Sequence, residues 1–311
     1  MSGWNEQAIP DQSGHVAVVT GANSGLGYVT ARELARKGAR VVLACRSEVR
    51  GHEAGDRLVT EVPGADVDVV RLDLGDLDSV REFARAYGQS YERLDLLVNN
   101  AGVMALPLGS TADGFETQFG VNHLGHFALT GLLLPALLAT PGARVVTLSS
   151  MMHALANIDI DDLNSERGAY RKWIAYARSK TANLLFTHEL ARRLCAVGSD
   201  VVAAAAHPGY ASTNLQTAGP RLAGRKGAER LMEMGNRVFA QSAEAGALPT
   251  LYAATAPGVG PDSFTGPSFA MWRGGPGKSW RAGWTLNDTA GERLWAASER
   301  LTDVTYDALK G

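Results

Sequence analysis

The sequence predicts an α/β fold in which helices cover both faces of a doubly wound, parallel β-sheet. Six short apolar runs of strand length alternate with segments of helical periodicity. Unbroken apolar runs of this kind are typical of parallel strands that are buried on both faces. A glycine-rich loop also joins the first run to the first helical segment, at the edge of the sheet where such folds bind ligands.

Local signals define the individual elements. The first run, His15–Thr20, is rich in valine, which favours strands. The helix Leu26–Lys37 ends before Gly38, because glycine commonly terminates helices. The helix Glu48–Val62 ends before Pro63 for a similar reason. The later elements alternate in the same way, with strands at Arg40–Cys45, Val67–Leu72, Leu94–Val98, Arg144–Leu148 and Asp200–Ala206, and helices at Leu77–Tyr87, Phe115–Ala139 (in one piece or two) and Trp173–Ala196.

The pattern changes from Tyr210 onward, where Gly, Pro, Arg and Trp are frequent. We expect a single domain over residues 1–311, because no Pro/Ser-rich linker divides the chain, with residues 1–13 as a loose polar arm and residues 210–285 as a helical lid over the substrate pocket. The expected elements are helices at Ala223–Phe239, Glu244–Ala254 and about Ala290–Glu299, and an edge strand at Ser263–Thr265. The apolar side chains that either line the pocket or form ordinary core are Met232, Met234, Phe239, Trp272, Trp280 and Trp284.

The charge balance argues against two classes of partner. Lys+Arg 30 and Asp+Glu 32 give a formal net charge of -2, so no basic excess attracts nucleic acid or an anionic membrane. The N-terminus lacks the pattern of a signal peptide. The apolar run Phe127–Ala139 contains Pro135 and is shorter than the ~20 residues of a membrane span. Cys45 and Cys195 form no C-x-x-C pair and are expected to be reduced, so we expect a cytoplasmic protein without a membrane span.

The loop Thr20–Gly27 has the pattern T-G-x-x-x-G-x-G and lies between the first strand and the first helix. Glycines in such a loop allow a tight turn and let a pyrophosphate approach bare backbone. The helix that follows presents free amides and the positive end of its dipole, which favour negative charge. The loop therefore predicts a nucleotide-binding site.

Tyr176 and Lys180 lie four positions apart, so they share one face of a long helix. A free tyrosine titrates near ~10, and a neighbouring ammonium lowers that pKa by stabilising the phenolate. The pair therefore suits proton transfer to or from a substrate oxygen. Ser149 and Ser150 follow the strand Arg144–Leu148, and adjacent side chains of a strand point in different directions, so one of these hydroxyls can face the same substrate.

Together these motifs resemble the short-chain dehydrogenase/reductase family, which they match in order from Thr20 to about Thr213. The resemblance implies a Rossmann-like fold and a nicotinamide cofactor. It implies that the catalytic residues are Asn122, Ser150 (with Ser149 as the alternative), Tyr176 and Lys180. It also implies that the cofactor is bound by Gly21, Asn23, Ser24, Gly25, Leu26, Gly27, Asp73, Leu74, Asn100, Ala101, Gly102, Tyr176, Lys180, Pro208 and Gly209.

Further features resemble the retinol-dehydrogenase-like branch of that family. Ser150 and Tyr176 are 26 positions apart, further than in most relatives, and the segment Met151–Arg171 lies between them. The motifs at Asn122–Phe127 and Tyr176–Phe186 also resemble this branch. The extended branch of sugar epimerases and dehydratases typically carries T-G-x-x-G-x-x-G, a pattern that this loop does not have.

The end of the second strand indicates which cofactor is used. A carboxylate there would bind the ribose hydroxyls of NAD and repel a 2'-phosphate. The sequence instead has Ala44-Cys45-Arg46-Ser47, and the guanidinium of Arg46 suits a phosphate and can stack on adenine. NADP(H) is therefore favoured, and NAD(H) is the alternative if Arg46 is only a solvated loop charge.

We expect an NADP(H)-dependent oxidoreductase that interconverts a small hydrophobic alcohol and its aldehyde or ketone, with Tyr176 as the general acid/base. The alternative is a non-catalytic NADP(H)-binding scaffold with a regulatory or redox-sensing role. A hydrolase is disfavoured because the chain has no G-x-S-x-G. No metal site is expected, because His123 and His126 lack Cys or Glu-x-x-His partners. Relatives pair through the two long helices, here Phe115–Ala139 and Trp173–Ala196, so the resemblance implies a homo-oligomer unless the C-terminal residues block that contact.

Overall fold

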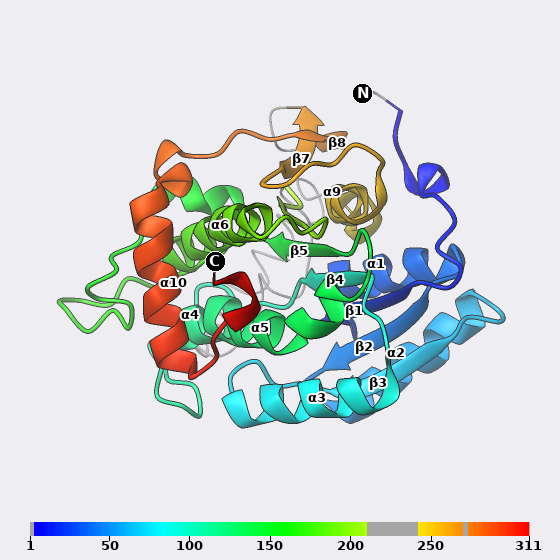
Figure 1. Ribbon diagram of the computed structural model, residues 1–311, viewed down its shortest axis with the longest axis horizontal. Coiled ribbons are helices and arrows are strands. Elements are labelled where there is room, and N and C mark those ends of the chain that lie inside the picture. The colour runs from blue at the N-terminus through cyan, green and yellow to red at the C-terminus, as the bar shows by residue number, and fades with distance from the viewer. Residues whose placement is uncertain (1–2, 210–241, 270–272, 311) are drawn as a thin grey trace, which may run out of the picture.

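The computed structural model describes residues 3–209, 242–269 and 273–310, which form one eight-stranded sheet with helices on both faces (Figure 1). The strand order is β3-β2-β1-β4-β5-β6-β7-β8. All neighbouring strands are parallel except β7 and β8, which are antiparallel. The strands are β1 Val16–Thr20, β2 Arg40–Cys45, β3 Val67–Arg71, β4 Leu96–Asn99, β5 Arg144–Leu148, β6 Val202–Ala206, β7 Phe264–Phe269 and β8 Arg273–Lys278.

The order of the strands reverses at β1. The chain places β2 and β3 on one side of β1 and then returns to place β4 on the other side. In open parallel sheets, ligands bind beyond the carboxyl ends of the strands at such a reversal. The topology therefore indicates a ligand site beyond the ends of β1 and β4.

Two hydrophobic clusters hold the helices to the two faces of the sheet. Val16 and Val18 of β1 belong to one cluster, and Ala17 and Val19 to the other, as the two-residue period of a strand requires. The first cluster includes side chains of α3, α5, α6 and α10, and the second includes α1, α2 and α9 (Figure 1). The helices are α1 Gly25–Arg36, α2 Glu48–Glu61, α3 Leu77–Ser90, α4 Thr117–Phe119, α5 Gly125–Leu138, α6 Lys172–Ala196, α9 Ala243–Thr255 and α10 Asp288–Thr302, with shorter turns η1 Glu6–Ala8, η2 Gly120–Leu124, η3 Met151–Leu155, η4 Gly283–Leu286 and η5 Asp307–Leu309.

The six predicted strands are all present, with ends that differ by at most two residues from those expected. Sequence reasoning missed β8, whose residues are Arg-Gly-Gly-Pro-Gly-Lys. Glycine and proline have low strand propensity, and proline is tolerated in strands at sheet edges. β8 is therefore a strand because it pairs with β7, as in the register Gly266↔Gly277, and not because of its own composition.

In the described part of residues 210–285, the chain extends the sheet and packs one helix on it, while residues 210–241 of the expected helical lid lie outside the described residues. β7 and β8 extend the sheet, and α9 lies on a face of the sheet in the same cluster as α1. Ala247 and Leu251 of α9 are fully buried there, so this helix is bound by the core and is not available to cover a pocket. Outside the described residues lie the expected helix Ala223–Phe239 and the apolar residues Met232, Met234, Phe239 and Trp272.

The N-terminal residues are not the loose arm that their polarity suggested. Trp4 meets Tyr252 of α9 edge-on, with ring centroids 5.3 Å apart. Ile9 is buried, and the Gln12 amide donates to the Lys37 carbonyl at 2.8 Å. A few apolar and backbone contacts thus order a segment that is mostly polar.

The long helix predicted at Phe115–Ala139 is divided in the structure. The π-helical turn Gly120–Leu124 separates α4 from α5, which agrees with the two-piece form of the prediction. The whole run Thr117–Leu138 is long and apolar enough to cross a membrane by length and composition, but 72% of its most apolar window is buried within the protein. That burial is typical of a core helix.

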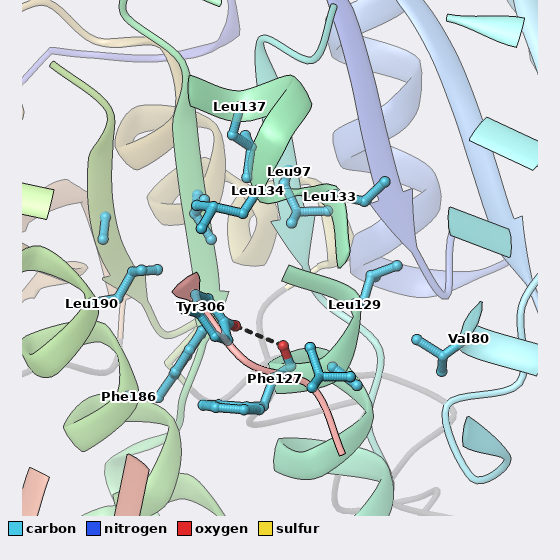
Figure 2. Close-up of a cluster of buried hydrophobic side chains, with 14 of the residues drawn as sticks. Val80, Leu97, Phe127, Leu129, Leu133, Leu134, Leu137, Phe186, Leu190 and Tyr306 are labelled. Carbon is cyan, nitrogen blue, oxygen red and sulfur yellow. Dashed lines mark hydrogen bonds between the residues drawn. The ribbon is translucent and has the colours of Figure 1, made fainter. Parts of the chain in front are cut away.

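The C-terminal residues cover the outer side of α5 and α6 (Figure 1). The Tyr306 hydroxyl donates to the Phe127 carbonyl at 2.6 Å (Figure 2). The Phe127 ring lies 4.9 Å from the Tyr306 ring and 5.2 Å from that of Trp295 in α10, measured between centroids. A Cβ on Gly131 would lie 2.7 Å from the Tyr306 ring, so only glycine allows this approach. Part of the surface through which relatives are expected to pair is therefore covered by the chain itself.

Candidate functional site

A cleft of about 320 Å³ lies at the carboxyl ends of the central strands, where the strand order reverses. Its volume is in the range of small-molecule and cofactor sites. The described residues that line it are Thr20, Gly21, Asn23, Ser24, Gly25, Leu26, Gly27, Ala44, Arg46, Ser47, Arg50, Leu72, Asp73, Leu74, Asn100, Ala101, Gly102, Val103, Val121, Leu148, Ser149, Tyr176, Lys180 and Pro208. Most of the residues expected to bind a cofactor are thus brought together.

The glycine-rich loop forms one wall of this cleft and leaves room for a diphosphate. Gly21 and Gly25 have φ angles of 65° and 57°, which favour glycine. A Cβ at Gly27 would lie 2.5 Å from Asn100 Nδ2 and 2.6 Å from the Gly21 carbonyl oxygen. The N-cap of α1, Ser24, makes no side-chain capping bond, so the amides of the first turn are free to bind an anion. The loop therefore fits the phosphates of a dinucleotide.

Thr20 ties this loop to the end of β4. Its hydroxyl oxygen accepts from the amides of Asn100 and Ala101, both at 2.9 Å, and the Asn100 side chain donates to the Thr20 carbonyl at 2.7 Å. His126 Nε2 is 2.9 Å from the same hydroxyl. Sequence reasoning placed Asn100 and Ala101 beside the cofactor but gave His126 no part in holding them.

The far end of the cleft is basic. Arg46 and Arg50 are exposed at the end of β2 and the start of α2 and both line the cleft, with Ser47 between them. Neither guanidinium makes a hydrogen bond or ion pair with the described part of the chain. Asp73, opposite, accepts from the Gly75 amide at 3.0 Å. Sequence reasoning found Arg46 but missed Ser47 and Arg50, although both lie within four residues of Arg46 at the start of the helix that follows β2.

Tyr176 and Lys180 lie on the buried face of α6 that lines the cleft, with 8% and 5% of their surface exposed. Lys180 Nζ is 5.8 Å from the centre of the Tyr176 ring and donates to the Leu148 carbonyl at 3.1 Å. Burial lowers the pKa of Lys180 to about 8. It raises the pKa of Tyr176 to about 12, although a hydrogen bond with the Ser150 side chain opposes this change. In the protein without cofactor, the desolvation of the phenol therefore outweighs any stabilisation of the phenolate by Lys180, and the net shift of the Tyr176 pKa is upward, not downward as we expected.

The two serines have different partners. The Ser149 hydroxyl donates to the Lys180 carbonyl at 2.8 Å. Its proton is therefore used in a hydrogen bond to the backbone of α6. The Ser150 hydroxyl accepts from the Met152 amide at 3.2 Å. Its side chain also lowers the pKa of the Tyr176 phenol, against the larger effect of burial. Ser149 lines the cleft and Ser150 is not among the lining residues, but the hydroxyl that reaches the phenol is that of Ser150.

Asn122 lies within the π-helical turn and is completely buried. Its side chain accepts from the Val103 amide at 2.7 Å and donates to the Val103 carbonyl and the Ser179 hydroxyl, both at 2.9 Å. A Cβ at Gly102 would lie 3.0 Å from Asn122 Oδ1 and 3.6 Å from Lys180 Nζ. Asn122 is therefore beside the reactive pair, but its polar atoms are held by protein groups.

The remaining histidines near the cleft are hydrogen bonded within the protein. His123 Nε2 is 2.9 Å from the Ser298 hydroxyl, and burial lowers the pKa values of His123 and His126 to about 3 and 4. Gly209 has a φ of 67°, and its amide donates to His207 Nδ1 at 3.1 Å beside the cleft residue Pro208. Within residues 3–209, 242–269 and 273–310, no group of three His, Cys, Asp or Glu side chains could hold a metal ion.

The comparisons with known proteins agree with this geometry. The family model described as short chain dehydrogenase matches residues 15–223. Retinol dehydrogenase 12 of Homo sapiens is 40% identical over 294 residues, which cover 94% of this chain and 88% of that protein. Retinol dehydrogenase 13 of Homo sapiens is 49% identical over 202 residues, which cover 65% of this chain and 60% of that protein. The crystal structure of an uncharacterized protein from Mycobacterium paratuberculosis superposes with a TM-score of 0.80 at 44% identity, covering 98% of this chain and 99% of that one.

Fold, cleft and relatives lead to one assignment. The parallel sheet carries a glycine-rich loop and a Tyr-x-x-x-Lys pair at one cleft. Members of the matched family use nicotinamide dinucleotides. The chain therefore belongs to the short-chain dehydrogenase family, in its retinol-dehydrogenase-like branch, and is an oxidoreductase that acts on CH–OH groups.

Proposed function

We propose that the protein uses NADP(H) to interconvert a hydrophobic alcohol and its aldehyde or ketone, with Tyr176 as the general acid/base. The observation that carries the proposal is the buried pair Tyr176 and Lys180 beside the cleft, with the half-buried Ser150 hydroxyl next to the phenol. A phenol and an amine that are both withdrawn from water differ from ordinary surface side chains, and such groups are typical of functional sites.

Each residue has a distinct part in the proposed reaction. With a pKa near 12, Tyr176 keeps its proton at neutral pH and can donate it to a carbonyl oxygen during reduction. The Ser150 hydroxyl donates a hydrogen bond to the same oxygen, where negative charge develops. Lys180, which is largely protonated at neutral pH, stabilises the phenolate that remains. The nicotinamide ring, when bound, supplies or accepts the hydride.

The preference for NADP(H) over NAD(H) is supported by the basic end of the cleft. The residue directly after β2 is Arg46 and not a carboxylate, and Arg46, Ser47 and Arg50 line this end of the cleft. Two guanidinium groups that make no bond with any described residue, together with a hydroxyl, form a donor set for a 2'-phosphate. Binding of NAD(H) remains the alternative, because exposed arginines also tolerate a ribose.

The proposal of a hydrophobic substrate is supported by exposed apolar side chains on α6 and η3. The Trp173 ring meets the Tyr176 ring edge-on at 6.5 Å between centroids and is 36% exposed. Leu155, at the end of η3, is 54% exposed. Relatives named retinol dehydrogenases make long apolar alcohols and aldehydes the first compounds to test.

The experiment is a screen of apolar carbonyls and alcohols, retinal and retinol included, followed at the absorbance of the reduced nicotinamide with NADPH and NADP⁺, or NADH and NAD⁺. Turnover with at least one pair, lost in Tyr176→Phe, is the expected result. NADPH binding by calorimetry without turnover on any compound would instead favour the regulatory scaffold.

Two further properties belong to the proposal. Cys45 and Cys195 are free thiols, as in reducing compartments, and we propose a cytoplasmic location, to be tested by fractionation of the native host cell.

We also propose that any homo-oligomer uses a face other than the parts of α5 and α6 that are covered by α10 and Tyr306. Sedimentation velocity measures its size.

A further inference from the structure

Two buried histidines join the reactive part of the cleft to one segment that is remote in sequence. That segment, residues 279–282 or Ser-Trp-Arg-Ala, follows β8, and we call it the anchor segment. His153 follows Ser150 in the turn η3, and His207 precedes the Pro208–Gly209 turn. Both histidines are completely buried.

His153 bridges the Ser150 turn and the anchor segment. Its Nδ1 lies 2.7 Å from the Ser150 carbonyl oxygen, and its Nε2 accepts from the Ala282 amide at 3.1 Å. An amide N–H can only donate, so Nε2 carries no proton. The proton is therefore on Nδ1 and is donated to the Ser150 carbonyl.

His207 makes the same kind of bridge with the opposite tautomer. The Gly209 amide donates to its Nδ1 at 3.1 Å, so Nε2 carries the proton and donates to the Ser279 hydroxyl at 2.8 Å. A Cβ at Gly266 would lie 1.9 Å from Nε2, so only glycine leaves space for this ring. Burial lowers the pKa of His207 to about 3 and also lowers the pKa of His153, which keeps both rings neutral.

The anchor segment is itself fixed. The Ser279 amide donates to the Phe264 carbonyl in β7 at 2.8 Å. Arg281 pairs with Asp262, with one N–O distance of 2.8 Å, and Asp262 also bonds His188 of α6 at 2.7 Å. The Phe264 ring lies between the two histidines, 5.6 Å from His153 and 5.1 Å from His207.

We propose that His153 and His207 are positioning residues that hold the Ser150 turn and the Pro208–Gly209 turn to this common anchor, and so set the distance between the Ser150 hydroxyl and the wall of the cleft that Pro208 forms. This inference rests on the proposed function in one respect, the role of Ser150. A reacting group must be held closely because a displacement of about 1 Å can cost on the order of 100-fold in rate.

Asparagine and glutamine separate the two bonds of each histidine. In His153→Asn the amide can still donate to the Ser150 carbonyl but is too short to reach Ala282, whereas in His153→Gln the carbonyl reaches the Ala282 amide. We expect His153→Asn to lower kcat about tenfold or more, as misplacement of a reacting group does, with the Kd for NADPH unchanged. His153→Gln should retain most of kcat.

Asparagine and glutamine substitutions also distinguish the two hydrogen bonds of His207. His207→Asn keeps an acceptor for the Gly209 amide and loses Ser279, and Ser279→Ala removes that partner without altering the buried ring. Both should raise the Kd for NADPH several-fold, whereas His207→Gln, which can still donate to Ser279, should not. His15→Asn, at the amino-terminal end of β1 and so at the opposite end of the strands from the cleft, is the control for loss of an imidazole.

A spectroscopic measurement tests the inference without turnover. In ¹⁵N-labelled protein, imidazole chemical shifts should identify a neutral Nδ1–H tautomer for His153 and a neutral Nε2–H tautomer for His207, each assigned by its variant. The other tautomer at either ring, or equal kcat and Kd values for the Asn and Gln variants, would overturn the inference. Ser150→Ala separates the two hypotheses: if it remains fully active while the tautomers and the NADPH affinities behave as expected, the role proposed for Ser150 is wrong and the anchoring stands.

Discussion

The Lys180 amine lies 5.8 Å from the centre of the Tyr176 ring and donates to the Leu148 carbonyl at 3.1 Å. Both side chains are buried, and burial favours the neutral form of each. It raises the pKa of the phenol to about 12 and lowers the pKa of the amine to about 8. At neutral pH the protein thus keeps a protonated phenol beside an ammonium group that loses its proton more easily than an exposed lysine does. This relationship determines the first two predictions.

Tyr176→Phe should lose on the order of 1,000-fold in kcat, within the range that a general acid/base contributes. Phenylalanine keeps the ring contact with Trp173, so the fold and the Kd for NADPH should be unchanged. Steady-state rates and calorimetry measure both quantities. Normal turnover by the variant would remove Tyr176 from the mechanism.

Lys180→Met should be more stable than the wild type at pH 7. The pKa of Lys180 falls from 10.5 to about 8 on burial, so at pH 7 the folded state holds its proton at a cost on the order of 3 kcal/mol. As the pH rises through about 8 the folded protein releases that proton and the cost declines, until the unfolded chain also releases its proton near 10.5. Asn183 still donates to the Leu148 carbonyl in the variant, at 2.9 Å.

Urea unfolding of both proteins at pH 7 and pH 10 measures this difference. The advantage of Lys180→Met should shrink at the higher pH, while the exposed Lys278→Met should show no such trend. An advantage that stays constant would mean that Lys180 is not desolvated. The stabilised variant should also be inactive, because it lacks the cation.

Arg46→Asp should weaken NADPH much more than NADH, because it replaces a donor for the 2'-phosphate with a charge that repels it. Arg50→Ala should have the same selectivity with a smaller effect, about tenfold, the value of one charge-assisted hydrogen bond. Dissociation constants for both cofactors measure the ratio. Equal effects on the two cofactors would mean that the basic end of the cleft does not bind phosphate.

Gly27→Ala should abolish dinucleotide binding and lower stability, since the added Cβ would lie 2.6 Å from the Gly21 carbonyl. Gly88→Ala is the control: it lies within α3 with nothing within 4 Å of the added atom. This second change should raise the free energy of unfolding by roughly 0.5–1 kcal/mol. Thermal unfolding and cofactor titration compare the two, and tolerance of alanine at Gly27 would contradict the close approach of the loop to β4.

Tyr306→Phe should cost about 1 kcal/mol through loss of the buried bond to the Phe127 carbonyl. Tyr306→Ala should cost about 3–5 kcal/mol, as large-to-small changes at buried aromatic residues do, and should expose the Phe127 side of α5. Chemical unfolding and sedimentation velocity distinguish the two variants. If the alanine variant is as stable and as small in solution as wild type, the C-terminal residues do not seal this face.

The parts of the site that were predicted from sequence are those in which neighbours in the chain are also neighbours in space. Gly21, Gly25 and Gly27 belong to one contiguous turn, and Tyr176 and Lys180 follow from the pitch of one helix. The strands were predicted because each is a continuous apolar run.

The parts that sequence did not predict depend on distant contacts. β8 is rich in glycine and proline and exists by pairing with β7. Residues 3–13 are ordered by contacts with α9 and with the end of α1. The direction of the Tyr176 pKa shift depends on burial by the whole fold, and the shared anchor of His153 and His207 joins segments that are 129 and 72 positions apart.

That anchor has a consequence for the order in which the protein is made. The loop, the basic end and the β4 edge of the cleft are all encoded before residue 104, so this half can form early while the chain leaves the ribosome. The part of the cleft that holds the Ser150 and Pro208–Gly209 turns cannot be fixed until residues 279–282 have been synthesised. These residues follow His207 by more than 70 positions. A nascent chain should therefore be able to hold a nucleotide well before it can do chemistry with it.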